Sequence, residues 1–127
     1  MIEVDAVIIG GGIVGSSAAL FLSQAGRRVA LLERDFCGSH SSGVNYGGVR
    51  RQGRPLSQLP LSQRAHEIWG RLPQLLGIDG EYQRSGHLKL ARSLEDLRAL
   101  HDYAASSQGF GLDLQLLDRA QLRARFP

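Results

Sequence analysis

The chain has 127 residues, of which 43% are hydrophobic and 21% charged, a composition typical of a folded domain and not of a disordered segment. Its net charge of +3 is too small and too scattered to favour nucleic-acid binding. The single Cys37 excludes a disulfide framework, and no metal site is predicted. No apolar run reaches about eighteen residues and the first residues do not have the pattern of a signal peptide, so we expect a cytoplasmic protein without a membrane span.

The first 33 residues have the pattern of a strand, a helix and a second strand. Residues 6–9 are apolar and partly β-branched, which predicts a buried strand. Residues 13–25 place alanine and leucine at spacings of three and four, which predicts a helix that Gly26 ends. Residues 29–32 then predict a second strand. The glycine-rich turn between the first strand and the helix therefore has the context of a dinucleotide-binding motif.

Each glycine of this turn meets a separate requirement. Gly10 allows the tight turn, Gly12 allows the backbone to approach a pyrophosphate, and Gly15 allows close packing of the helix on the strands. The positive end of the helix then faces the anion. Glu33 follows the second strand, where a carboxylate can accept hydrogen bonds from both ribose hydroxyls and would repel a 2′-phosphate. The motif therefore favours FAD or NAD over NADP.

The remainder of the chain alternates between loops and regular elements. Residues 34–60 are rich in glycine and serine, which predicts a long loop that is either functional or a flexible surface segment. The hydrophobic patterns beyond it predict a helix over 61–76, a strand over 82–91, a helix over 94–107, a strand over 112–116 and a final helix after Asp118. Pro73 is expected to kink or end its helix, or to begin a further turn. Ser93 and Asp96, like Asp118 and Gln121, have the spacing of a capping box.

Three features from Asp5 onward resemble the FAD-binding start of the D-amino-acid oxidase superfamily, which includes glycine oxidase and sarcosine oxidase. The first is the triple glycine with its flanking strand and helix. The second is Glu33-Arg34, which resembles the family's ribose-binding acid and the residue beside the adenine. The third is the sequence Ser-Ser-Gly-Val-Asn-Tyr-Gly-Gly-Val-Arg over residues 41–50, which resembles the family's flavin loop. This third feature favours FAD over NAD.

The resemblance implies two groups of cofactor-binding residues. Those expected to line the adenosine and pyrophosphate are Gly10, Gly12, Ile13, Val14, Gly15, Glu33, Arg34, Ser41 and Ser42. Those expected near the isoalloxazine are Asn45, Gly47, Gly48 and Val49. His40 is interpreted as a turn residue and not as a point of covalent flavin attachment. No catalytic residue is assigned.

The implied fold is α/β: a Rossmann-type FAD-binding βαβ unit with the start of an α+β substrate domain, incomplete because family members are much longer. We expect the FAD-binding unit and flavin loop over residues 1–60, a helix continuing that domain over 61–80, and the beginning of the substrate domain over 81–127. Such a chain is expected to be marginally stable and inactive alone. A partner polypeptide could supply the missing part.

The implied function is that of an FAD-dependent oxidoreductase, which oxidises the C–N bond of an amino acid or secondary amine by hydride transfer to flavin. Three alternatives stay open at the level of sequence. They are an NAD-linked dehydrogenase, a flavin-dependent 2-hydroxy acid or glycerol phosphate dehydrogenase, and a non-catalytic dinucleotide-binding fragment of a split enzyme.

Overall fold

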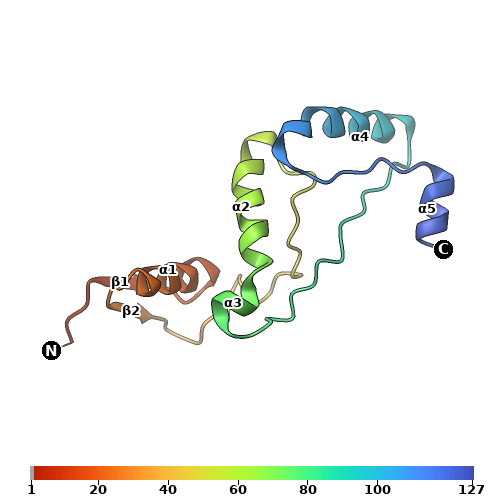
Figure 1. Ribbon diagram of the computed structural model, residues 1–127. Helices are drawn as coiled ribbons and strands as arrows, with labels where there is room; N and C mark the ends of the chain where they lie inside the picture. The colour runs from red at the N-terminus through yellow and green to blue at the C-terminus, as the bar shows by residue number, and fades with distance from the viewer. Residues whose placement is uncertain (1) are drawn as a thin grey trace. The chain divides into compact units, whose positions relative to one another are not determined.

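The computed structural model describes residues 2–127 (Figure 1). The described chain divides into two compact units, one that ends at Gly48 and one of residues Val49–Pro127. The first unit contains β1 (Ala6–Ile9), α1 (Ile13–Gln24) and β2 (Val29–Leu32). The second contains α2 (Leu59–Trp69), α3 (Leu72–Leu76), α4 (Leu94–Ser106) and α5 (Arg119–Arg125), with single 3-10 turns η1 (Leu56–Gln58) and η2 (Gln108–Phe110). No helix among the described residues is both long and apolar enough to cross a lipid bilayer.

The first unit is a parallel βαβ unit, as the sequence predicts. Strands β1 and β2 pair in register from Ala6 opposite Val29 to Ile9 opposite Leu32. Helix α1 connects them and packs on the sheet face that carries Ile8, since a Cβ built on Gly15 would lie 3.2 Å from Ile8 Cγ2. The α/β class and the order of these elements are confirmed.

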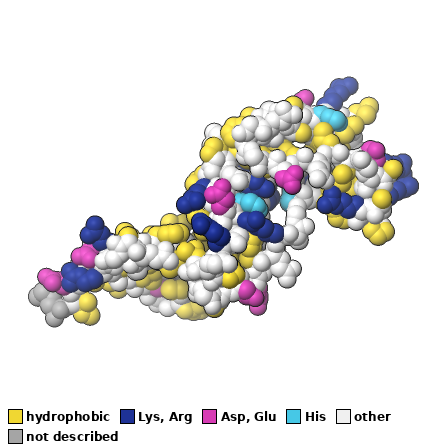
Figure 2. Space-filling view, viewed as in Figure 1, with side chains coloured by type: hydrophobic (Ala, Val, Ile, Leu, Met, Phe, Trp, Pro, Cys, Tyr) yellow, Lys and Arg dark blue, Asp and Glu magenta, His cyan; other side chains and the backbone are white. Residues whose placement is uncertain are grey.

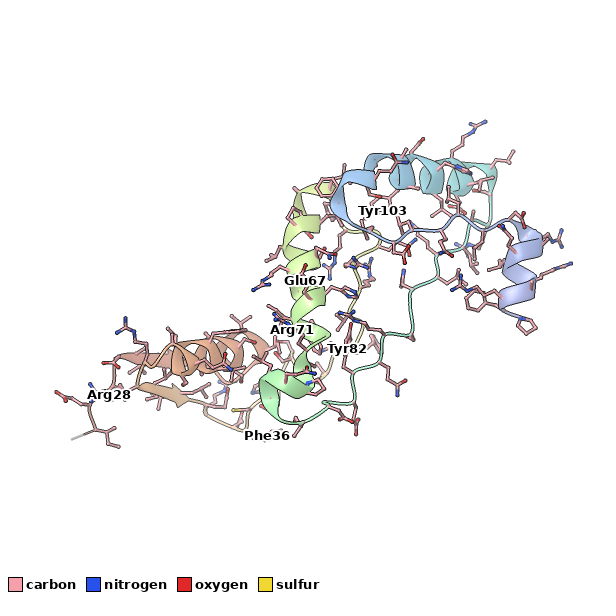
Figure 3. The ribbon with its side chains drawn as sticks, viewed as in Figure 1. Arg28, Phe36, Glu67, Arg71, Tyr82 and Tyr103 are labelled. Carbon is pink, nitrogen blue, oxygen red and sulfur yellow. The ribbon has the colours of Figure 1, made fainter. Side chains whose placement is uncertain are left out.

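Both ends of this unit are closed by local hydrogen bonds. At the start of the strands, the Arg28 amide donates to the Asp5 carboxylate at 2.8 Å and the Arg28 guanidinium donates at 3.3 Å (Figure 3). These bonds, the backbone one first, hold the pKa of Asp5 below its usual value. At the end of α1, Gly26 has a φ of +76°, and the Arg27 amide donates to the Leu22 carbonyl at 3.0 Å. The predicted glycine stop is therefore confirmed as a Schellman motif.

The face of the sheet away from α1 is largely exposed. Because side chains alternate along a strand, Val7 and Ile9 share this face with Leu32. They are 56%, 87% and 56% exposed, respectively. Hydrophobic side chains lie on the surface of both units (Figure 2), and Leu59 is the one fully buried hydrophobic residue in the described part of the chain. This exposure supports the expectation of marginal stability for the isolated chain.

The helix predicted over residues 61–76 is instead two helices, and the first begins earlier, at Leu59. The break falls at Gly70, where the Arg84 guanidinium donates to the His66 carbonyl at 2.6 Å. A Cβ on Gly70 would lie 2.1 Å from Arg84 Nη2, so the bare glycine leaves room for this cap. Pro73 lies in the first turn of α3, where its missing N–H breaks no helical hydrogen bond. It therefore begins a further turn.

The strands predicted over residues 82–91 and 112–116 are wrong: the structure has irregular backbone in both segments. Alternating polarity indicates a chain suited to one buried face, but a strand also requires a partner for its backbone groups. In residues 2–127 neither segment has such a partner, and Leu88 and Leu90 are exposed. Side-chain bonds connect other parts of this unit, such as that from Tyr103 Oη to the Arg54 carbonyl at 3.1 Å (Figure 3).

Both predicted helix caps are present. The Asp118 side chain accepts from the Gln121 amide at 2.8 Å and the Gln121 side chain accepts from the Asp118 amide at 2.9 Å, so α5 begins with a full capping box. At α4, Ser93 Oγ accepts from the Asp96 amide at 3.1 Å. The Asp96 carboxylate, however, accepts from the amide of Arg92 at 2.9 Å, one residue before the cap. An aspartate side chain, which is shorter than the usual glutamate, thus completes a variant of the predicted capping box.

Replacing Ser93 with alanine is expected to lower the free energy of unfolding of the second unit by about 1 kcal/mol, because the first turn of α4 loses its side-chain acceptor. Urea unfolding followed by far-UV circular dichroism measures the change. Ser106→Ala at the other end of α4 is the matched control. Its hydroxyl donates to the Tyr103 carbonyl within the same helix, so its loss should change the unfolding free energy by only a few tenths of a kcal/mol. Equal losses in the two variants would contradict the capping role.

Candidate cofactor-binding site

The register of the parallel strands places the glycine turn and Glu33 at the same edge of the sheet. Since Ile9 lies opposite Leu32, the chain leaves β1 at Gly10 and β2 at Glu33 side by side. The Gly10 amide donates to the Leu32 carbonyl at 2.8 Å, which continues the ladder by one bond. Gly10 then turns with a φ of +102°, a conformation that favours glycine. The carboxyl edge of the sheet is where doubly wound folds bind their ligands.

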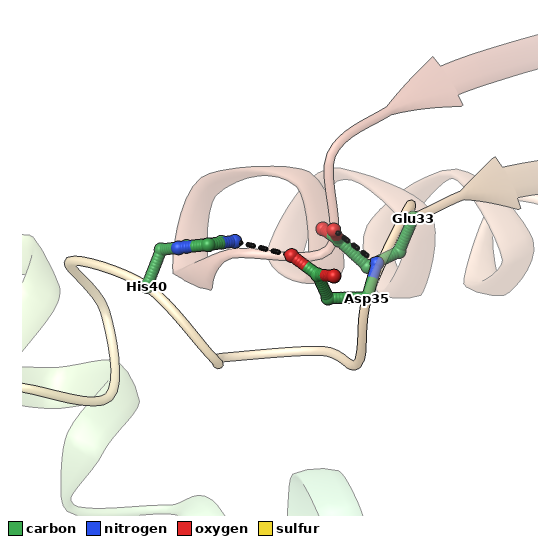
Figure 4. Close-up of side chains that lie close together, drawn as sticks. All are labelled: Glu33, Asp35 and His40. Atoms are coloured by element: carbon green, nitrogen blue, oxygen red, sulfur yellow. Dashed lines mark hydrogen bonds and ion pairs between the residues drawn. The ribbon is translucent and has the colours of Figure 1, made fainter.

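The Glu33 carboxylate connects this edge to the glycine turn. Its Oε2 accepts from the Gly11 amide at 2.6 Å, and its Oε1 accepts from the Asp35 amide at 3.1 Å (Figure 4). These bonds, that of Gly11 first, lower the pKa of Glu33, so the side chain is ionised at neutral pH. A carboxylate offers about four lone-pair positions, so two remain to accept ribose hydroxyls.

The glycines of the turn leave space that side chains would fill. A Cβ on Gly15 would lie 1.9 Å from the Gly10 carbonyl oxygen, so α1 can approach the turn only with glycine there. A Cβ on Gly12 would lie 3.0 Å from Ser42 Oγ. Between them, Ile13 and Val14 are exposed and begin the helix. The turn thus forms the bare backbone cradle that a pyrophosphate requires.

Ser42 joins the later loop to the N-terminus of α1. Its Oγ accepts from the Ile13 amide at 2.9 Å. The first N–H groups of a helix have no intrahelical acceptor, and the helix dipole makes this end positive. A hydroxyl that accepts from Ile13 keeps its own proton free to donate to a phosphate oxygen. Ser42 therefore lies beside the N-terminus of α1, and its predicted contact with a pyrophosphate stays a prediction.

The rest of the predicted loop is held less firmly. Asn45 accepts from the Gly47 amide at 2.7 Å through Oδ1 and donates to the Ser42 carbonyl through Nδ2, so it organises its own turn. Ser41 is exposed, and Arg34, 82% exposed, lies 3.6 Å from Asp35. Phe36 extends from the same loop (Figure 3). Gly48 ends the first unit and Val49 begins the second, so Asn45, Gly47 and Gly48 belong to the same unit as the glycine turn and Val49 does not.

Three residues that help to form this site, Gly11, Asp35 and His40, were not among the site residues predicted from the sequence, where His40 was interpreted as a turn residue. Gly11 is buried; it donates to Glu33, its carbonyl accepts from the Gly38 amide at 3.0 Å, and its ideal Cβ would lie 2.5 Å from Cys37 Sγ. The His40 imidazole lies within hydrogen-bonding distance of the Asp35 carboxylate, with 2.6 Å between Nε2 and Oδ2, beside Glu33 (Figure 4). The triple glycine was a signal for Gly11. An aspartate and a histidine five residues apart in a loop carry no such signal, since only the folded loop brings them together.

The chain is similar to proteins of a known family. The model of a family described as FAD dependent oxidoreductase matches residues 5–127. A subunit of the opine oxidase of Rhizobium meliloti is 30% identical over 138 residues, with all of this chain and 37% of that protein covered. The 4-methylaminobutanoate oxidase (formaldehyde-forming) of Paenarthrobacter nicotinovorans is 36% identical over 92 residues, or 72% of this chain and 11% of that protein.

Two solved structures resemble the fold of this chain. Glycine oxidase from Bacillus cereus superposes with a TM-score of 0.77 at 28% identity, over 97% of this chain and 34% of that one. L-amino acid deaminase from Proteus vulgaris superposes with a TM-score of 0.85 at 23% identity, over 97% and 33%, a likeness of fold alone. The chain thus spans little more than a third, at most, of these relatives. With the βαβ unit, the glycine cradle and the family match over residues 5–127 in agreement, the chain belongs to the D-amino-acid oxidase family of FAD-dependent oxidoreductases.

Proposed function

We propose that this chain binds the adenosine and pyrophosphate of FAD at the edge of the β1–β2 sheet. One observation carries the proposal. Glu33 and Ser42 reach the glycine turn from opposite ends of the following loop, at 2.6 Å from the Gly11 amide and 2.9 Å from the Ile13 amide. An acid suited to a ribose and a hydroxyl suited to a phosphate therefore flank one helix N-terminus. An NAD site would need the acid for the ribose, but it would not need a serine hydroxyl from the later loop, so the pair of groups favours FAD.

The residues have distinct roles in this proposal. Glu33 accepts the ribose hydroxyls, and Arg34 lies beside the adenine. The backbone of Gly10, Gly12 and Gly15, with the exposed start of α1 at Ile13 and Val14, receives the pyrophosphate, and Ser41 and Ser42 donate to it. Asn45, Gly47, Gly48 and Val49 pass near the isoalloxazine, where small residues allow the backbone to approach a planar ring.

We further propose that the whole protein oxidises the C–N bond of an amino acid or secondary amine. Bound FAD would accept the hydride that leaves the substrate carbon beside nitrogen, and water would hydrolyse the resulting imine to a carbonyl compound and an amine. The names of the relatives, an opine oxidase and a methylaminobutanoate oxidase, support this substrate class. The part played by this chain is to bind and orient the cofactor.

The domain boundaries and the partner are also proposals. We place the FAD-binding unit and flavin loop in residues 1–60, the helices that continue it in 61–80, and the start of the substrate domain in 81–127. The exposed face of Val7, Ile9 and Leu32 supports a second layer of protein over this sheet. A relative that is one subunit of its enzyme supports a partner polypeptide as one source of that layer. The single Cys37 suits a reducing compartment such as the cytoplasm.

The absorption spectrum of the purified protein after incubation with FAD and gel filtration tests the cofactor. We expect flavin absorption to elute with the protein. Parallel thermal melts with NAD and with FAD distinguish the two dinucleotides, since only a ligand that binds the folded state raises the melting temperature. Stabilisation by NAD alone would overturn the proposal in favour of a nicotinamide-dependent enzyme.

A further inference from the structure

We infer that Asp35 and His40 are a positioning pair, which holds the loop of residues 33–42 closed against the glycine turn so that Glu33 and Ser42 face the cofactor together. This inference rests on the proposed FAD site and adds to it the residues that keep the site assembled. Neither residue is expected to contact FAD. Their role is exerted through Glu33 and Ser42.

The geometry shows a loop closed at successive points. His40 Nε2 lies 2.6 Å from Asp35 Oδ2, and the Asp35 amide donates to Glu33 at 3.1 Å (Figure 4). One carboxylate oxygen from each of Glu33 and Asp35 and one imidazole nitrogen of His40 all lie within 4.8 Å of one another. Pairing with Asp35 therefore keeps His40 beside the carboxylate that is proposed to bind the ribose.

The turn that begins at His40 delivers Ser42 to the helix. The His40 carbonyl accepts from the Gly43 amide at 2.9 Å and from the Val44 amide at 3.2 Å. Ser42 lies inside this turn, and its Oγ accepts from the Ile13 amide at 2.9 Å. The Gly38 amide and the Ser42 hydroxyl also hold this loop to the glycine turn and the helix, so opening of the Asp35–His40 pair loosens the loop without releasing it. By fixing His40, the pair thus helps to position Ser42, which is proposed to contact the pyrophosphate.

The charges around His40 give the pair a pH dependence of defined sign. Asp35 and Glu33 face the imidazole, and the Arg34 guanidinium lies 3.6 Å from Asp35 and competes for the same carboxylate. A protonated imidazole attracts the Asp35 carboxylate more strongly than a neutral imidazole does. Histidine side chains change charge between about pH 5 and 8. We therefore expect the attraction between His40 and Asp35, and with it the closed loop, to be favoured at about pH 5.5 and less so at about pH 8.5.

The first experiment measures the loop without cofactor. Hydrogen–deuterium exchange of the Gly38 and Gly43 amides is recorded at these two pH values in EDTA-containing buffer and corrected for intrinsic rates. The variants are His40→Gln, Asp35→Asn and His40→Arg, with His101→Gln on α4 as the matched control. Because the pair is solvent-exposed, we expect protection at the lower pH to fall about two- to five-fold in the first two variants. His40→Arg keeps a cation opposite Asp35 and should retain protection at both pH values.

The second experiment measures the FAD dissociation constant of the same proteins by quenching of flavin fluorescence. We expect wild type to bind about two- to five-fold more weakly at the higher pH than at the lower one. The ratio of the FAD dissociation constants at the two pH values should fall to one in His40→Gln and in His40→Arg. His40→Gln should bind FAD weakly at both pH values, and His40→Arg should bind it tightly at both. A wild-type protection and FAD affinity in His40→Gln would overturn the inference and leave the FAD site standing. Pair-dependent protection without FAD binding at either pH would instead refute the FAD site, and with it the role of the pair toward the cofactor.

Discussion

Substitution of Gly15 by alanine is expected to unfold the β1–α1–β2 unit at room temperature. The added Cβ would lie 1.9 Å from the Gly10 carbonyl oxygen and 3.2 Å from Ile8 Cγ2. The first of these atoms is backbone at the start of the glycine turn, so no side-chain rotation relieves the overlap and α1 must move away from β1. Overpacking typically costs about 1–3 kcal/mol and occasionally more. An overlap with a backbone atom falls at the upper end of that range, which is a large fraction of the marginal stability expected for a unit whose sheet is covered on one face only.

Circular dichroism during urea unfolding measures the effect, and Gly48→Ala is the matched control. A Cβ on Gly48 meets nothing within 4 Å, and its backbone does not need a positive φ, so the stability of that variant should stay within about 0.5 kcal/mol of wild type. If Gly15→Ala and Gly48→Ala had equal midpoints, close packing at Gly15 would not be what holds α1 on the strands.

Replacement of Glu33 by glutamine is expected to weaken FAD binding roughly 10- to 100-fold, because hydrogen bonds to a charged acceptor contribute about 1.5–3 kcal/mol. The amide side chain also presents one oxygen where the carboxylate presents two, so it cannot accept from Gly11 and Asp35 and still serve both ribose hydroxyls. Titration of the protein into FAD, followed by flavin fluorescence, measures the affinity. Glu3→Gln, which alters an exposed acid 3.7 Å from Arg28, is the matched control and should bind as wild type.

The pH dependence of this variant adds a second readout. The Gly11 and Asp35 amides lower the pKa of Glu33 from its ordinary 4.5. A carboxyl group with a depressed pKa contributes stability that is present above its unfolded pKa and lost as pH falls through the folded one. Wild-type stability should therefore decline in acid below pH 4.5, and this part of the decline should be missing in Glu33→Gln. An unchanged acid profile would show that Glu33 does not hold the turn.

The sequence was most informative where the structure is determined by short-range physics. The βαβ unit, the glycine end of α1 and the caps at Ser93 and Asp118 each follow from periodicity or from one side chain that satisfies nearby backbone groups. The same local rules place Gly10 at the turn and Glu33 beside it, since both follow from the length of the strands.

The failures occur where a residue's structure depends on a distant partner. Residues 82–91 have the alternation of a strand, yet alternation does not supply the second strand that would pair with them. The helix break at Gly70 depends on Arg84, which lies well beyond it in the chain. Likewise, the pairing of His40 with Asp35 exists only after the loop has folded back on Gly11. The contacts that hold the loop of residues 33–42 together therefore follow from no local pattern, unlike the positions of Gly10 and Glu33 at the edge of the sheet.

The pairing of Ile9 with Leu32 also makes cofactor choice sensitive to insertions and deletions. Glu33 contacts the glycine turn because the last residues of β1 and β2 lie opposite each other. The length of β2 therefore determines which residue reaches the turn. Removal of a single residue from β2 would advance the chain by one position and bring Arg34 to the place of Glu33. A guanidinium beside the ribose suits a 2′-phosphate, whereas an acid repels it. The loss of a single codon from this strand would thus replace the acid at the proposed ribose position with a cation, with every glycine of the motif intact.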